Sequence, residues 1–339
     1  MKSYLPRIVL SILLCLFSFS CQRKSILPPK ATDKGSDSSN IEVLNDVDKQ
    51  VISPYKHWKF GSKSYLHTKK ILDIGPRPIE SEGHQKVQAY ITTHLEKFGW
   101  NVSRQNLKAM TPYGERSFVN LIARRKDAIK SPNIVLAAHY DSKLMDGFLG
   151  ADDAASSVAA LLEIAEYLPS HENAITQQME LVFFDGEEAL TPSIEYLKDG
   201  LYGSIYYSKY MRNDVAGDKK TYLHIPKFGI LLDMIGHRNL SIKIPSDTPK
   251  SLRESYFAVI EKHQLRDRFG VANGSILDDH YPMNMIAKIP TIDIIGDFSA
   301  KTWWHTNRDN MDNISENSLN VSIQVALEII KHQLEKENE

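Results

Sequence analysis

The chain has 339 residues, of which 42% are hydrophobic, and its 41 basic and 42 acidic side chains give a formal net charge of −1 at pH 7. This length and apolar content allow one catalytic domain with a substantial core. The lysines and arginines are scattered along the chain rather than gathered in one stretch, so we expect no nucleic-acid partner.

The N-terminus has the pattern of a bacterial export signal. Lys2 and Arg7 precede an apolar run that is too short to span a bilayer comfortably. Residues 18–21, at the end of this run, resemble a lipobox, in which small residues precede a cysteine that becomes lipidated. We therefore expect a signal peptide over residues 1–20 and a lipid anchor at Cys21, which would hold the exported protein on the cell envelope, facing the periplasm or the exterior. Plain secretion is the alternative.

The next segment differs in composition from the rest of the chain. Residues 21–51 are rich in Lys, Ser, Asp, Asn and Pro and show no sustained apolar period, which predicts a flexible tether. Residues 52–339 are then the expected single catalytic domain. Cys15 would leave with the signal peptide and Cys21 would carry the lipid, so the folded part is expected to contain no disulfide.

Helical and strand patterns alternate along the catalytic domain. Residues 83–100 place Val87 and Ile91 at helical spacing, with Gly99 at the end of the helix. Residues 134–138 form an unbroken apolar run, as expected of a strand buried on both faces. Further apolar runs lie at residues 118–123, 180–184, 228–232 and 289–295, and further helical patterns at 154–168 and 318–334. The alternation predicts an α/β sandwich with a mostly parallel central sheet flanked by helices.

Acidic and histidine residues lie where these runs end. His139 follows the first run, Glu187 and Glu188 follow the run at 180–184, and Asp233 follows the run at 228–232. Asp153 stands at the start of a helical pattern. Open α/β sheets bind ligands just outside the carboxyl ends of their strands, so we expect these side chains to converge.

The residue types favour a zinc site of the catalytic kind. Catalytic zinc takes three nitrogen or oxygen ligands and keeps one position open, whereas structural zinc usually has cysteine ligands. We expect Asp153, Glu188 and His305 to bind the metal. Glu187 would stand beside it as the proton-transfer residue, because adjacent side chains leave the backbone in different directions.

Each of these residues also has an ordinary interpretation when it is taken alone. Asp152 and Asp153 suit a helix N-cap, Glu187 and Glu188 a solvated loop pair, His139 a hydrogen-bonded core histidine, and Trp304 simple packing. Asp233 differs, because an unpaired carboxylate after a continuous apolar run would be costly to bury. The separate interpretations do not explain why every strand end carries an acid or an imidazole.

Short motifs give a resemblance to a known family. They are HYDSK at 139–143, GADD at 150–153, FFDGEEA at 183–189, LYGS at 201–204, LLDMIG at 231–236, DDH at 278–280 and WHT at 304–306. In this order they resemble the glutaminyl-peptide cyclotransferases, or glutaminyl cyclases, from about residue 60 to the end of the chain. The wider group is the zinc aminopeptidase clan, which shares the fold and most of the metal-site positions.

The resemblance implies one zinc per chain, bound by the three ligands named above, with Glu187 as general acid/base. Asp233 and Asp278 would stabilise the reacting groups, and Trp304 would line the substrate pocket. The implied substrates are peptides or proteins that begin with glutamine. The α-amine attacks the side-chain amide carbon, which leaves pyroglutamate and releases ammonia.

Some positions depart from the animal members of the family. Ala138 and Val158 stand where those enzymes have a cysteine pair, and residues 190–200 lack a second pocket tryptophan. Asp293 replaces a histidine, and we assign it no catalytic role.

Two alternatives remain open. In a two-zinc aminopeptidase, His139 and Asp233 would hold a second metal, with Asp153 bridging the two ions. The combination of DDH at 278–280, YDSK at 140–143 and the pair Trp304-His305 favours the cyclase. The other alternative is a surface-tethered binding protein without activity. Such a protein should have lost at least one metal ligand or Glu187, but all of these residues are present in the sequence.

Overall fold

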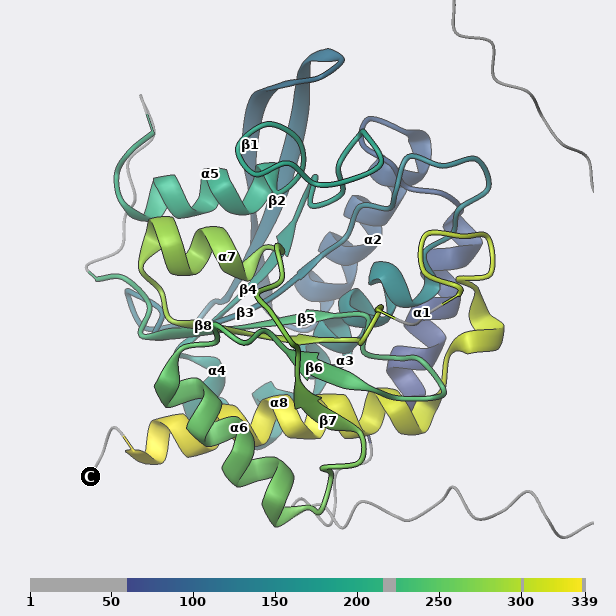
Figure 1. Cartoon of the computed structure of the whole chain (residues 1–339). Helices are drawn as coiled ribbons and strands as arrows, with labels where there is room; N and C mark the ends of the chain where they lie inside the picture. Colours follow the sequence, from purple (N-terminus) through teal and green to yellow (C-terminus); the bar gives the residue numbers. More distant parts are fainter. Residues whose placement is uncertain (1–59, 216–223, 300–301, 337–339) are drawn as a thin grey trace, which may run out of the picture. The chain divides into compact units, whose positions relative to one another are not determined.

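The computed structural model describes residues 60–215, 224–299 and 302–336, so the expected signal peptide and tether lie outside the described residues. Six strands form the central sheet (Figure 1): β1 (Trp100–Thr111), β2 (Gly114–Arg125), β3 (Ile134–His139), β4 (Met179–Phe184), β5 (Phe228–Asp233) and β8 (Thr291–Ile295). Their order across the sheet is β1-β2-β4-β3-β5-β8. The pairs β4/β3, β3/β5 and β5/β8 are parallel, which confirms the predicted mostly parallel sheet.

Helices cover both faces of this sheet (Figure 1). The helices are α1 (Ser62–Ile74), α2 (Glu82–Lys97), α3 (Ser157–His171), α4 (Asn173–Thr176), α5 (Tyr202–Met211), α6 (Lys250–Lys262), α7 (His280–Pro282) and α8 (Glu316–Lys336). Shorter helical turns are η1 (Ala151–Ser156), η2 (Met283–Ala287) and η3 (Met311–Asn313), and a small parallel sheet pairs β6 (Ile242–Ile244) with β7 (Phe269–Val271). None of the helices within the described ranges combines the length and apolarity needed to cross a bilayer.

Strand β3 shows why the central runs are apolar throughout. Ile134, Leu136 and Ala138 pack into a core that α1, α2, α3, α6 and α8 cover, whereas Val135 and Ala137 pack into a second core with α5 and η2. Side chains alternate between the faces of a strand, so β3 is apolar at successive positions because both of its faces are covered.

Strand β1, at one edge of the sheet, was not predicted, whereas the apolar run predicted at 118–123 lies within β2. Strands β1 and β2 form a long antiparallel hairpin, and β2 also pairs antiparallel with β4. Most side chains of β1 are exposed or half-buried, so its sequence lacks an apolar run. The predicted helix over 83–100 ends at Lys97, and Trp100 already belongs to β1. Its buried indole Nε1 donates to Ala165 O on α3 at 2.9 Å, which fixes the strand start against that helix.

Two further segments differ from the sequence expectation. The helix predicted over 154–168 spans Ser157–His171, because η1 precedes it and Asp153 and Ala154 have non-helical backbone angles. No helix or strand was expected where α1, α5, α6, β6 and β7 lie.

A close approach between α5 and the sheet gives a test of this packing. A Cβ atom on Gly203 would lie 2.2 Å from Asn120 Oδ1 and 2.5 Å from Asp185 O. We expect Gly203→Ala to lower the free energy of unfolding by about 1–3 kcal/mol, since overpacking forces backbone shifts. Gly270→Ala is the matched control, because no atom lies within 4 Å of its added Cβ. Urea unfolding of both variants measures the difference, and equal stabilities would contradict the packing described.

Candidate metal centre and active site

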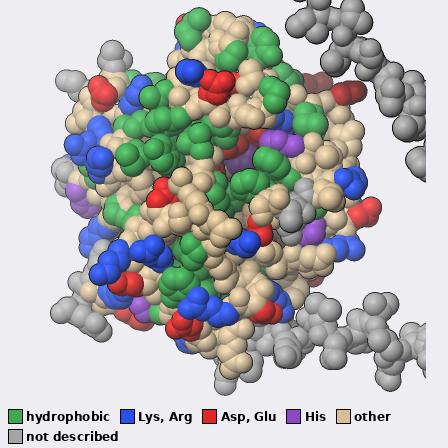
Figure 2. Space-filling model, viewed as in Figure 1, with side chains coloured by type: hydrophobic (Ala, Val, Ile, Leu, Met, Phe, Trp, Pro, Cys, Tyr) green, Lys and Arg blue, Asp and Glu red, His purple; other side chains and the backbone are tan. Residues whose placement is uncertain are grey.

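The side chains that follow the parallel strands meet beside one cavity. His139 ends β3, Asp233 ends β5, Glu187 and Glu188 follow β4, and Asp153 lies in η1. All five are buried. The cavity has a volume of about 290 Å³. Figure 2 shows hydrophobic side chains gathered around a hollow in which histidine atoms are visible. The convergence expected at the carboxyl ends of the strands is therefore present.

The three expected zinc ligands lie together. Asp153, Glu188 and His305 each offer one ligand atom, and these atoms lie within 4.8 Å of one another. His305 Nε2 is 3.4 Å from Asp153 Oδ2 and 3.3 Å from Glu188 Oε1. Glu188 Oε1 is buried without a hydrogen-bond partner, as expected of an atom that faces a cation. Two carboxylates and one imidazole are the donor set of a catalytic zinc site, so these residues fit zinc.

A second group shares Asp153. His139 Nε2 lies 3.2 Å from Asp153 Oδ1 and 3.4 Å from Asp233 Oδ1, and these three residues could also hold a cation. The geometry thus contains both donor sets of the two-zinc alternative. Burial lowers the pKa of His139, but hydrogen bonds to Asp141, Asp153 and Asp233 raise this pKa well above its usual value. The protonated imidazole can therefore supply positive charge at this position.

Asp141 fixes the direction of the two glutamates. Its carboxylate accepts hydrogen bonds from Glu187 N at 3.3 Å and Glu188 N at 3.2 Å. Gly186, which precedes them, has φ +68°, and a Cβ there would lie 2.6 Å from the Phe118 ring. Both glutamates that follow this tight turn line the cavity. Asp141 belongs to the motif at 139–143, but the sequence assigned it no role.

Asp309 and Arg77 hold the backbone that carries Asp153. Asp309 accepts hydrogen bonds from Asp152 N at 2.8 Å and Asp153 N at 3.1 Å. Arg77 is fully buried and donates to the carbonyls of Tyr140, Leu149 and Gly150, so it joins the end of β3 to the start of η1. Burial lowers the pKa of Arg77 to about 10, which leaves the guanidinium charged at neutral pH. No pattern in the sequence singles out either residue.

Burial controls the charge of the carboxyls in the cavity. It raises the pKa of Glu187 well above the usual value, and the charges of Asp278, Glu188 and Asp279 add to this against the opposing effect of His139. The pKa values of Asp233 and Asp278 are also raised, again mainly by burial. A carboxyl with a raised pKa can hold and release a proton near neutral pH, which suits proton transfer.

Lys143 balances the charge on the other side of the ligand group. Its Nζ lies 3.2 Å from Glu188 Oε2, and both side chains are almost fully buried. Lys143 also lines the cavity. It is the last residue of the motif at 139–143, where the sequence assigned it no role. Glu188 is thus held by a cation through Oε2, and its Oε1 faces His305 in the expected ligand group.

An apolar wall closes one side of the cavity. Trp304 donates from Nε1 to Asp153 Oδ2 at 3.1 Å and stacks on His305 with ring centroids 4.0 Å apart. Phe298 packs on Trp304 at 4.8 Å. From the segment without tryptophan, Ile194 lines the cavity. Trp304 is therefore more than simple packing, because it contacts two of the expected ligands.

The remaining expected residues are placed as follows. Asp278 lines the cavity, whereas Asp293 lies behind it on β8 with Oδ2 3.3 Å from His280 Nδ1. Asp152 and Asp153 lie in η1, and neither side chain caps α3, so the N-cap interpretation is wrong. The solvated-pair interpretation is also wrong, because both glutamates are buried.

Comparison with known proteins identifies the family. Residues 120–330 match peptidase family M28. The glutaminyl-peptide cyclotransferase of Bos taurus is 30% identical over 294 residues, and the match covers 75% of this chain and 79% of the relative.

Solved structures give the same result. The glutaminyl cyclase of Bacteroides thetaiotaomicron, bound to N-acetylhistamine, is similar with a TM-score of 0.68 at 30% identity, over 80% of this chain and 97% of that chain. A Zn-dependent exopeptidase from Parabacteroides distasonis also has a TM-score of 0.68, at 26% identity, over 80% and 98% of the two chains. These similarities confirm the resemblance and the predicted fold class. The chain therefore belongs to peptidase family M28 and, within it, to the glutaminyl-peptide cyclotransferases, which are acyltransferases.

Proposed function

We propose that this protein is a zinc-dependent glutaminyl-peptide cyclotransferase that converts the N-terminal glutamine of peptides or proteins to pyroglutamate and releases ammonia. The observation that carries the proposal is the cavity in which Glu187 stands beside the Asp153, Glu188 and His305 group. A volume of about 290 Å³ suits one amino-acid side chain with its amine, and Trp304 supplies an apolar wall for it.

Glu187 is the proton-transfer residue of this proposal. Its carboxylate takes a proton from the attacking α-amine and passes it to the departing ammonia, so no water is consumed. Asp153, Glu188 and His305 would hold a zinc ion, which would supply polarisation of the substrate γ-carbonyl and stabilise the developing negative charge. Asp233 and Asp278 line the same cavity and can position the amine and amide groups. Curling the glutamine side chain against Trp304 brings the reacting atoms together, which is a large part of the barrier in an intramolecular reaction.

The two-zinc aminopeptidase is the second candidate, because His139, Asp153 and Asp233 form a further donor group. In the cyclase, one zinc per chain suffices, and a protonated His139 takes the place of the second cation. His139 lies 3.2–3.4 Å from carboxylate oxygens of Asp141, Asp153 and Asp233, and this negative surrounding favours the protonated form.

The proposed reaction predicts the products. With a dipeptide amide that begins with glutamine, we expect ammonia release, a product lighter by one ammonia, and no free glutamine. Ammonia detection and mass spectrometry of one reaction measure both. Free glutamine without ammonia would identify an aminopeptidase instead.

The role of Glu187 is tested in the same assay. Glu187→Gln should lower kcat by about 10²- to 10⁴-fold, the usual contribution of a general acid/base, while zinc content stays unchanged. Glu195→Gln is the matched control, because Glu195 is exposed on the segment that follows and does not line the cavity. Loss of zinc together with activity would move Glu187 from proton transfer to metal binding.

Ile194 is expected to shape the pocket in place of a second tryptophan. Ile194→Ala should raise KM roughly 10-fold or more with a smaller change in kcat, because removing apolar contact weakens side-chain binding by about 1–3 kcal/mol. Leu197→Ala in the same segment is the control, since Leu197 is 61% exposed and does not line the cavity. Equal KM values for both variants would remove Ile194 from the substrate pocket.

We also propose that the protein is exported and anchored to the cell envelope through Cys21. The basic residues and apolar run before Cys21 support this location, and the sequence has no further cysteine after it. Cys21→Ser should move the protein from the membrane fraction to the soluble fraction of the host cell. Membrane association that survives Cys21→Ser would exclude the lipid anchor.

A further inference from the structure

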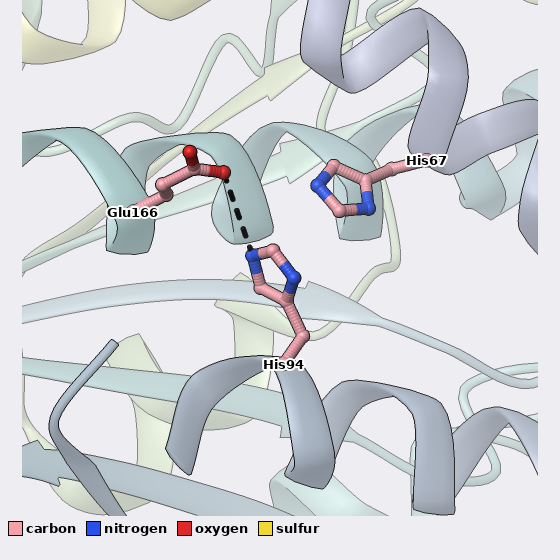
Figure 3. Close-up of side chains that lie close together, drawn as sticks. All are labelled: His67, His94 and Glu166. Carbon is pink, nitrogen blue, oxygen red and sulfur yellow. Dashed lines mark ion pairs between the residues drawn. The ribbon is translucent and has the colours of Figure 1, made fainter. Parts of the chain in front are cut away.

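Three helices bring metal-ligating side chains together away from the cavity. His67 lies on α1, His94 on α2 and Glu166 on α3. Figure 3 shows the two imidazole rings turned toward the Glu166 carboxylate. One ligand atom from each residue lies within 4.8 Å of the other two. None of the three lines the cavity of the proposed active site, so the cyclase reaction leaves this cluster unexplained.

The donor atoms of the cluster are available. His67 Nδ1 is 2.6 Å from Tyr90 Oη, which leaves His67 Nε2 for a ligand. His94 Nε2 is buried without a hydrogen-bond partner and lies 4.0 Å from Glu166 Oε2. The two rings meet edge to face with centroids 4.5 Å apart. A buried nitrogen that faces a second imidazole and a carboxylate is unfavourable without a partner, and a cation would supply one.

The charge state of the cluster suits a metal. Burial lowers the pKa of His67 to about 4, and the positive charges of His94 and Lys63 act in the same direction. The pKa of His94 is also lowered, mainly by burial. Neutral imidazoles offer the lone pairs that metal ions need. Lys63 pairs with Glu166 Oε1, so Oε2 is the carboxylate oxygen left for an ion.

We propose that His67, His94 and Glu166 form a second metal site, which binds a divalent transition-metal ion of the zinc and copper class and joins α1, α2 and α3. Two imidazoles and one carboxylate are typical ligands of such ions. Tetrahedral ligands at about 2.1 Å stand roughly 3.4 Å apart, so small side-chain rotations close the site. The His94 and Glu166 side chains are 12% and 20% exposed, which leaves a path for the ion and for a water as fourth ligand.

Tyr90 and Lys63 would tune this site. A histidine that binds metal through one nitrogen usually donates a hydrogen bond from the other, and Tyr90 Oη, 2.6 Å from His67 Nδ1, can accept it. The positive charge of Lys63 repels the metal ion and so weakens its binding. Removing Tyr90 Oη should weaken binding about 10-fold, and removing the Lys63 ammonium should tighten it about 2- to 5-fold.

The test counts metal ions in the full chain. Protein stripped with a chelator and dialysed against Zn²⁺ should hold one zinc more than His94→Gln, whatever number the active site binds. The difference in zinc content between wild type and His94→Gln therefore tests this metal site independently of the proposed reaction. His171→Gln, an exposed histidine on α3, is the matched control and should keep the wild-type count. Glu166→Gln provides a second variant if His94→Gln does not fold.

Cu²⁺ provides the second measurement. The electron paramagnetic resonance spectrum of Cu²⁺ bound to wild-type protein should show a component with two coupled imidazole nitrogens, and this component should be absent from His94→Gln. In a separate measurement, Zn²⁺ should raise the Tm of wild-type protein more than that of His94→Gln. Lys63→Met should bind Cu²⁺ 2- to 5-fold more tightly. Equal zinc counts in wild type, His94→Gln and Glu166→Gln, with identical Cu²⁺ spectra, would overturn the proposal.

Discussion

Buried negative charge at the carboxyl ends of the parallel strands is the constraint on which the site depends. Glu187, Asp233 and Asp278 are buried around one cavity, and burial raises the pKa of each. Several carboxylates cannot stay ionised in such a place without positive charge close by. His139 and Lys143 supply part of it, and a divalent ion between the expected ligands would supply the rest. The proposed proton transfer would follow from this shortage of positive charge, because burial raises the pKa of Glu187.

A hydrogen-bonded frame keeps these charges in place. Asp141 holds the turn that carries the two glutamates, Asp309 holds η1, and Arg77 joins η1 to the end of β3. The ligands therefore stand on backbone that is fixed before a substrate arrives, as electrostatic catalysis requires. The metal site proposed at His67, His94 and Glu166 would help to hold η1 in place, since α3 directly follows η1 and carries Glu166.

Residues close in sequence to the strand ends could be predicted, and residues that act across the fold could not. Parallel strands end at one edge of the sheet, so Glu188 and Asp233 were expected to meet from the apolar runs, and Asp153 was expected to join them from the start of the helical pattern. Strand β1 and its pairing with β2 were missed because β1 is largely exposed. Arg77 and Asp309 bond to backbone groups far away in sequence, and no local pattern marks such contacts. The cluster on α1, α2 and α3 was not predicted either, because its three residues come from helices that are separate in the sequence.

The claim that one zinc ion and a protonated His139 balance the buried carboxylates is tested most directly by diffraction. Data are collected from zinc-soaked crystals on both sides of the zinc absorption edge. We predict an anomalous peak between Asp153, Glu188 and His305, and no peak between His139 and Asp233, where protonated His139 supplies the positive charge. A second peak between His139 and Asp233 would contradict the account and identify the two-metal arrangement of an aminopeptidase. The absence of any peak at Asp153 would show that the buried carboxyls are balanced by protons alone.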